Sequence, residues 1–159
     1  MYGSIKSIKS INKVIQLKKI IKFDKAKIIY CPPYTLLNNF TVKLKKTKIE
    51  VGAQNCHHIS SDGPYTGSVS SFMIKNLGCK YVILGHSENR LEGETNKIIN
   101  KKIKIALSNK LKIIFCVGEN IKDKKYNITK KILTNQILFG LKNIKNIKNI
   151  IFAYEPVWS

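Results

Sequence analysis

The feature that most constrains this chain is an alternation of short apolar runs with longer segments of helical spacing. Apolar runs predict strands at residues 27–31, 49–54, 81–84, 111–117 and 149–154. Helical spacing predicts helices at residues 4–17, 34–44, 68–76, 94–109 and 129–143, with Ser4 as the first N-cap. Strands that alternate with helices in this way form parallel βαβ units, so the predicted fold class is α/β.

Two architectures fit this alternation, a doubly wound open sheet and an incomplete (β/α)₈ barrel with about five βα units. The chain has only 9 acidic residues, yet Glu88, Glu119 and Glu155 each follow a predicted strand closely. Barrels carry their reactive groups at the carboxyl ends of several strands. The glycine-rich phosphate loops GxGxxG and GxxxxGK[ST] do not occur in the sequence. Both observations favour the barrel, as a single partial domain over residues 1–159.

The net charge of +20 taken alone would indicate a nucleic acid or an anionic membrane surface as partner. Such a partner needs a localised basic patch. The lysines instead run through the whole chain, interleaved with Ile and Asn, which is typical of a solvated surface. A non-catalytic basic half-barrel that binds nucleic acid therefore stays only as the alternative reading.

The cysteine and hydropathy patterns indicate a reducing cytoplasmic setting. The four cysteines show neither CxxC spacing nor a paired Cys/His cluster, so neither a zinc site nor a disulfide framework is predicted. We expect His57 and His58, beside Cys56, to be loop residues. No apolar stretch is long enough for a membrane span, and the first residues lack the apolar block of a signal peptide.

One candidate site segment is Gly85-His86-Ser87-Glu88. Gly85 permits a tight turn off the preceding strand, and Ser87 with Glu88 suits the first turn of a helix. The positive potential at a helix N-terminus favours a neutral imidazole at His86. Such an imidazole can donate a hydrogen bond to a substrate oxygen, although a loop histidine without a chemical task fits the same pattern.

A second candidate segment is Ala153-Tyr154-Glu155-Pro156-Val157-Trp158. The residue before a proline is disfavoured in the α region, so Glu155 is expected to be extended at the end of its strand. A carboxylate among apolar neighbours suits proton abstraction. A surface glutamate in a turn would fit this segment equally well.

Considered together, these segments belong to a set of six that follow one another at characteristic spacings. The six are Cys31-Pro32-Pro33-Tyr34, Val51-Gly52-Ala53-Gln54-Asn55, Tyr65-Thr66-Gly67, Ile83-Leu84-Gly85-His86-Ser87-Glu88, Cys116-Val117-Gly118-Glu119 and Ala153-Tyr154-Glu155-Pro156-Val157-Trp158. In order and near-spacing the set resembles the triosephosphate isomerase family, and the match covers nearly the whole chain.

The resemblance implies interconversion of dihydroxyacetone phosphate and glyceraldehyde 3-phosphate through an enediolate, without metal or organic cofactor. Glu155 would move the proton and a neutral His86 would polarise the carbonyl oxygen, which is the pairing known for this family. Glu88 and Cys116 would support this pair from behind, with Glu88 helping to place a catalytic cation. The loop with Thr66 and Gly67 would reach into the partner of a cytoplasmic homodimer.

The chain also departs from the family pattern. The family's substrate-phosphate lysine has no counterpart, because Met1 aligns just after it, and Pro156-Val157-Trp158 would be the first hinge of the family's lid. Asn89 and Ser68 replace the usual arginine and acidic residue. We therefore expect the isolated chain to be inactive and poorly soluble, since exposed strand edges promote aggregation.

Overall fold

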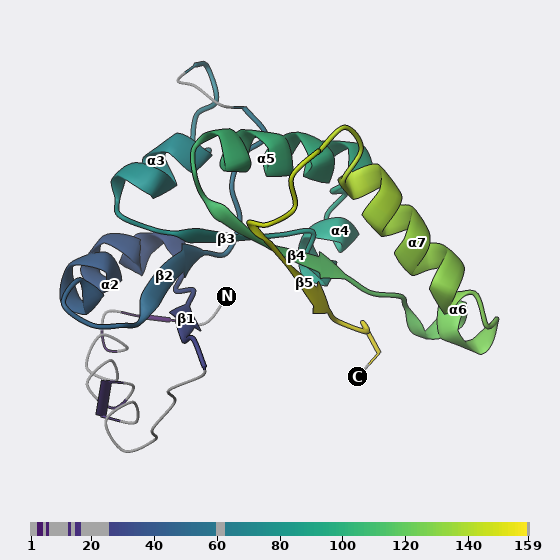
Figure 1. Ribbon diagram of the computed structural model, residues 1–159, viewed down its shortest axis with the longest axis horizontal. Coiled ribbons are helices and arrows are strands. Elements are labelled where there is room, and N and C mark those ends of the chain that lie inside the picture. The colour runs from purple at the N-terminus through teal and green to yellow at the C-terminus, as the bar shows by residue number, and fades with distance from the viewer. Residues whose placement is uncertain are drawn as a thin grey trace.

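The protein is a curved parallel sheet with helices along its outer side, as shown in Figure 1. A computed structural model describes residues 3–4, 6, 13, 15–16, 26–59 and 63–158. The predicted helix at residues 4–17 lies largely outside the described residues. Within them, no helix is both long and apolar enough to cross a membrane.

The sheet has five strands whose spatial order equals their order along the chain. The strands are β1 Ile29–Tyr30, β2 Glu50–Ala53, β3 Tyr81–Leu84, β4 Lys112–Val117 and β5 Ile150–Tyr154. All four neighbouring pairs are parallel, with partners such as Gly52 and Tyr81, or Ile113 and Ile150. A doubly wound sheet reverses its strand order at a switch point, whereas this order never reverses. The sheet is therefore part of a barrel, as the placement of acidic residues indicated.

The helices fill the connections between successive strands. They are the 3₁₀-helix η1 Tyr34–Leu36 and the α-helices α2 Leu37–Leu44, α3 Ser71–Asn76, α4 Ser87–Leu91, α5 Asn96–Ser108, α6 Ile121–Lys125 and α7 Thr129–Gly140. Several begin at side chains that accept otherwise unpaired backbone N–H groups. The Ser70 hydroxyl caps α3, the Thr95 hydroxyl caps α5, and Asn120 with Asp123 forms a reciprocal capping box at α6.

The hydrophobic core lies between the sheet and the helices on its outer side. The strands contribute Val82, Leu84, Ile113 and Phe115, and α5 contributes Ile99, Ile103 and Ala106, all fully buried. Ile99, Ile103 and Ala106 share one face of the helix because they are spaced by three and four residues. This packing holds the strands rigidly, so the residues at their carboxyl ends keep fixed positions.

Apart from the helix at residues 4–17, which stays a prediction, the predicted strands and helices are confirmed within the described residues, with two differences at the helices. The segment predicted as a helix from residue 68 becomes helical only after Ser70, whose extended backbone forms the cap of α3. The helix α6 was not predicted, because five residues rich in lysine carry no apolar period. The start of α6 can nevertheless be recognised in the sequence, because Asn120 and Asp123 have the types and spacing of a capping box.

Candidate active site

His86 lies at the carboxyl end of β3, where the chain turns into α4. The preceding Gly85 has φ +77°, a left-handed conformation that glycine adopts without strain. His86 is the N-cap of α4, and its Nδ1 accepts the backbone N–H of Glu88 at 3.3 Å. Since a neutral imidazole carries one proton, we assign that proton to Nε2, on the opposite side of the ring.

The Nε2 atom of His86 faces the carboxylate of Glu155 at the end of β5. Nε2 and Oε1 of Glu155 are 2.9 Å apart, and the Ser87 N–H donates to Oε2 at 3.5 Å. Both side chains are partly open to solvent, 30% exposed for His86 and 36% for Glu155. The structure therefore joins the two residues singled out from separate segments of the sequence into one acid–base pair.

The backbone of Glu155 is fixed by close contact with the end of β4. Its N–H donates to the Val117 carbonyl at 2.9 Å. A Cβ atom placed on Gly118 would lie 1.7 Å from the Glu155 carbonyl oxygen, so only glycine permits this approach. The peptide groups that flank the Glu155 side chain consequently have little freedom to move.

The Glu119 side chain restrains the chain on both sides of Glu155 through hydrogen bonds. Its carboxylate is only 2% exposed and accepts the Tyr154 hydroxyl at 3.1 Å and the Trp158 indole N–H at 3.0 Å. Burial raises the pKa of Glu119, but the hydrogen bonds from Trp158, from its own backbone N–H and from Tyr154, with the nearby charge of Lys124, outweigh it and lower the pKa below its ordinary value. The sequence placed Glu119 after a strand, but its clamping contacts were not predicted.

Other polar side chains form a network near the end of β2. The Asn55 amide donates to Asn89 at 3.0 Å and to Glu94 at 2.9 Å, and its oxygen accepts the Lys102 ammonium at 3.0 Å. Lys102 also forms an ion pair with Glu94. Asn89, noted as a departure from the family's usual arginine, thus takes part in a neutral hydrogen bond at this position.

The remaining predicted site residues lie at different distances from the pair. Glu88 is 75% exposed, and its carboxylate is 3.7 Å from Nδ1 of His86, so its backbone makes the closer contact. Cys116 is buried at the end of β4, and burial raises the pKa of its thiol to about 11. Thr66 and Gly67 are exposed in the loop between β2 and α3. Their supporting and dimer roles stay predictions.

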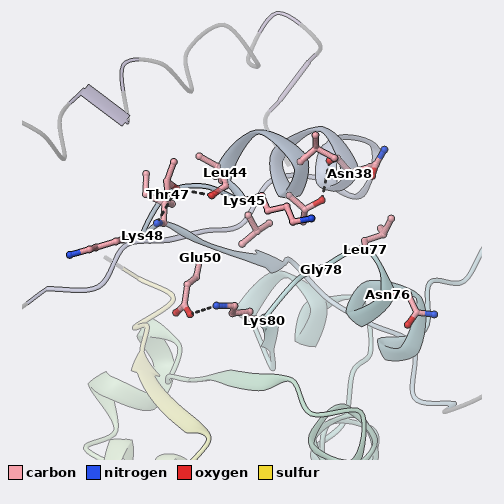
Figure 2. A pocket seen from close by; sticks show the side chains of 14 residues that line it. Asn38, Leu44, Lys45, Thr47, Lys48, Glu50, Asn76, Leu77, Gly78 and Lys80 are labelled. Atoms are coloured by element: carbon pink, nitrogen blue, oxygen red, sulfur yellow. Dashed lines mark hydrogen bonds and ion pairs between the residues drawn. The ribbon is translucent and has the colours of Figure 1, made fainter.

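A cavity of about 510 Å³ lies at the other end of the sheet, between α2 and α3 (Figure 2). Glu50 and Lys80, at the starts of β2 and β3, lie on its wall and form an ion pair of 3.1 Å. Parallel strands place their starts far from their carboxyl ends, so this cavity is remote from His86 and Glu155.

Comparison with known proteins gives a consistent result. The model of the triosephosphate isomerase family matches residues 1–159. A triosephosphate isomerase of Dictyoglomus thermophilum is 43% identical over 152 residues, which cover 94% of this chain and 60% of the relative. One of Clostridium botulinum (strain ATCC 19397 / Type A) is 40% identical over 149 residues, which cover 92% of this chain and 60% of the relative.

A solved structure agrees with these sequence matches. The crystal structure of triosephosphate isomerase from Bartonella henselae superposes with a TM-score of 0.89 at 35% identity, and covers 100% of this chain and 65% of that one. The chain thus spans about 60% of the length of the curated relatives described above.

Proposed function

Because the chain belongs to the triosephosphate isomerase family, we propose that it carries the acid–base pair that interconverts dihydroxyacetone phosphate and glyceraldehyde 3-phosphate. The observation that carries the proposal is the 2.9 Å contact between Nε2 of His86 and Oε1 of Glu155. The comparisons give no support to the alternative of a nucleic-acid-binding half-barrel.

Glu155 is the proposed base. Its carboxylate would take the proton from the carbon beside the substrate carbonyl and return it to the neighbouring carbon. Proton transfer by a positioned side chain contributes about 10²–10⁴-fold to a rate. The contacts of its backbone with Val117 and of Glu119 with Tyr154 and Trp158 support this role, because they restrain the chain on both sides of the carboxylate.

His86 is the proposed hydrogen-bond donor to the carbonyl oxygen. The acceptor position of Nδ1 directs the ring proton to Nε2, where it would stabilise the negative charge that develops as the enediolate forms. A substrate oxygen that takes this hydrogen bond must replace Oε1 of Glu155. The carboxylate is thereby released at the moment the carbonyl becomes polarised.

The family membership extends the proposal to the setting of the reaction. We propose a homodimer in which the exposed loop with Thr66 and Gly67 contacts the partner, with Glu88 and Cys116 supporting the catalytic pair and the cytoplasm as location. Tyr65, 41% exposed beside this loop, and Phe72 and Met73 on α3 supply apolar surface for such a contact.

A chimera tests the proposed chemistry. The region of the Bartonella henselae enzyme that superposes on this chain is replaced by residues 1–159, and isomerisation is measured in both directions. We expect an active chimera whose kcat falls about 100-fold in His86→Gln and in Glu155→Asp, because either change displaces a reacting group. Lys97→Gln, on the exposed side of α5, is the matched control and is expected to leave kcat unchanged.

The proposal is wrong if the chimera is active and neither substitution lowers kcat. A second measurement addresses residues 1–159 expressed alone. Within the described residues, β1 and β5 each have one unpaired edge, and the Ile151, Phe152 and Tyr154 side chains on β5 are exposed. We expect this polypeptide to show no isomerase activity above that of its His86→Ala variant.

A further inference from the structure

Arg90 is the only arginine among the 29 basic residues of the chain, and it is half-buried beside the candidate active site. Its guanidinium makes three hydrogen bonds. Nε donates to the Gly85 carbonyl at 2.7 Å, Nη2 to the Cys116 carbonyl at 3.2 Å, and Nη1 to the Asn96 side-chain oxygen at 2.7 Å. One side chain thus joins the end of β3, the end of β4 and the start of α5.

The acceptors of Arg90 show what kind of interaction this is. All three are neutral oxygens, and within the described residues no carboxylate lies within ion-pair distance of the guanidinium. Burial lowers the pKa of Arg90, although the guanidinium stays charged. A lysine has a single nitrogen and cannot reach three acceptors held in a planar fork. The position therefore requires the geometry of arginine, and its charge without this geometry would not suffice.

Arg90 also forms hydrogen bonds with the backbone on both sides of the His86 side chain. The side chain fixes the carbonyl of Gly85, directly before His86, and the backbone N–H of Arg90 donates to the His86 carbonyl at 3.1 Å. A Cβ atom on Gly85 would lie 2.9 Å from Nη2 and 2.9 Å from the Cys116 carbonyl oxygen, so the turn is tightly packed against the guanidinium. Two consecutive peptide groups around His86 are thereby held in place.

We propose that Arg90 is the positioning residue of His86, and that its guanidinium fork fixes the turn that presents Nδ1 to the Glu88 N–H and Nε2 to Glu155. The catalytic meaning of this role rests on the proposed function. The claim about the orientation and tautomer of His86 does not, because it concerns geometry that can be measured without any turnover.

The test is ¹⁵N NMR of the histidine-labelled chimera described above, at a pH where the imidazoles are neutral, because the isolated chain is expected to be poorly soluble. The chain has three histidines, and the His86 signals are assigned by their loss in His86→Gln. In the wild type we expect Nδ1 of His86 to be unprotonated and Nε2 protonated. In Arg90→Lys, which keeps the charge but removes the fork, we expect both nitrogens to shift toward the average of the two tautomers. Lys104→Gln, exposed on α5, is the control and is expected to leave them unchanged.

A folded Arg90→Lys chain, as judged by circular dichroism, with wild-type His86 signals would overturn the proposal. If Arg90→Lys does not fold, Asn96→Ala decides, because it removes only the acceptor of Nη1 and leaves the Thr95 cap of α5 intact. A smaller shift of the His86 signals in the same direction supports the proposal, and unchanged signals overturn it.

A kinetic measurement in the active chimera adds a second readout. Arg90→Lys is expected to lower kcat about 100-fold with little change in KM, because misplacing a reacting group weakens the transition state more than substrate binding. A rise in KM at unchanged kcat contradicts a positioning role. Failure of the proposed function would appear separately, as a chimera indifferent to His86→Gln and Glu155→Asp.

Discussion

Charged side chains at the two ends of the sheet have different kinds of partner. At the carboxyl ends, the carboxylate of Glu119 and the guanidinium of Arg90 pair with neutral groups, namely hydroxyl, indole and carbonyl. At the amino ends, Glu50 pairs with the ammonium groups of Lys27 and Lys80, each at 3.1 Å. Hydrogen bonds with neutral partners fix the direction of the Glu119 and Arg90 side chains, whereas the two lysines mainly neutralise the charge of Glu50.

The difference in exposure sharpens this contrast. The Lys27 and Lys80 side chains are 52% and 60% exposed, so water competes with their ion pairs. The Glu119 carboxylate is shielded from water and accepts directed hydrogen bonds from Tyr154, directly before Glu155, and from Trp158, three residues after it. Hydrogen bonds at the carboxyl end therefore fix side-chain positions, whereas the exposed ion pairs at the amino end contribute only modest stability.

The largest expected effect is a loss of unfolding free energy when a methyl group is added at Gly118, close to the carboxyl ends of the strands. In Gly118→Ala, the new methyl group would overlap the Glu155 carbonyl, and we expect the free energy of unfolding to fall by more than about 4 kcal/mol. Urea unfolding followed by circular dichroism measures it. Gly67→Ala is the control, because it has φ +82° but no atom near its Cβ, and should cost about 1–2 kcal/mol. Equal losses at the two sites would contradict the close approach at Gly118.

The next effect concerns the neutral partners of Glu119. In Glu119→Gln, the NH₂ group that replaces one oxygen cannot accept the Tyr154 proton, and the remaining oxygen accepts from Tyr154 and Trp158 without the charge of a carboxylate. We expect a loss of about 2–3 kcal/mol in unfolding free energy. Trp158 is the only tryptophan, so its fluorescence emission should also shift to longer wavelength. The exposed Glu92→Gln is the control. Unchanged stability and emission in Glu119→Gln would show that the clamp is not formed.

A smaller effect, dependent on pH, is expected at the amino end. Burial raises the pKa of Glu50, but hydrogen bonds from Lys27 and Lys80 outweigh it and bring the pKa to about 2, from an ordinary 4.5. A lowered pKa stabilises the fold above the ordinary value, and this contribution disappears as the pH falls from about 4.5 to about 2. We expect Glu50→Gln to cost about 1 kcal/mol at neutral pH, since both lysines are exposed.

Unfolding free energies of the wild type and Glu50→Gln, measured across this pH range, check that expectation. The difference should shrink steadily as the solution is acidified. A difference that stays constant down to pH 2 would mean that the ion pairs contribute nothing and that the substitution acts through packing alone.

The smallest effect is expected on the wall of the cavity. Val42 is 67% exposed there, so Val42→Ser should change the unfolding free energy by less than about 0.5 kcal/mol. Its His86 NMR signals should equal those of the wild type. Loss of a buried neighbour offers the matched contrast, since Phe40→Ala on the same helix should cost about 3–5 kcal/mol. A shift of the His86 NMR signals in Val42→Ser would show that the two ends of the sheet are coupled.

The sequence predicts the strands well because each is an apolar run that the core requires. It also predicts that His86 and Glu155 share one end of the sheet, because both follow strands that run in parallel. The contacts of Arg90 with Cys116 and of Glu119 with Trp158 join residues 26 and 39 positions apart. No local pattern encodes such pairs, although a single arginine among so many lysines marks a position that deserves inspection.

Glu88 shows a different limit of prediction from sequence. Its type and position suggest a side chain that serves His86, yet its closest contact to the imidazole is the backbone N–H. That hydrogen bond would form with most residue types at position 88, because it depends on α4 beginning at Ser87. The start of α4, which Arg90 holds in place under the proposal above, therefore directs the tautomer that we assign to the imidazole.

The strand order has a consequence for how the protein is made. Each described strand after β1 pairs with the strand before it in the chain, so each of these βα units finds its neighbour already synthesised as it leaves the ribosome. Pairing between successive units keeps loop closure short and favours rapid docking. The turn that carries His86 can thus form on β3 and β4 before Glu155 is translated. The proposed base is therefore added to a site in which the histidine already has its position.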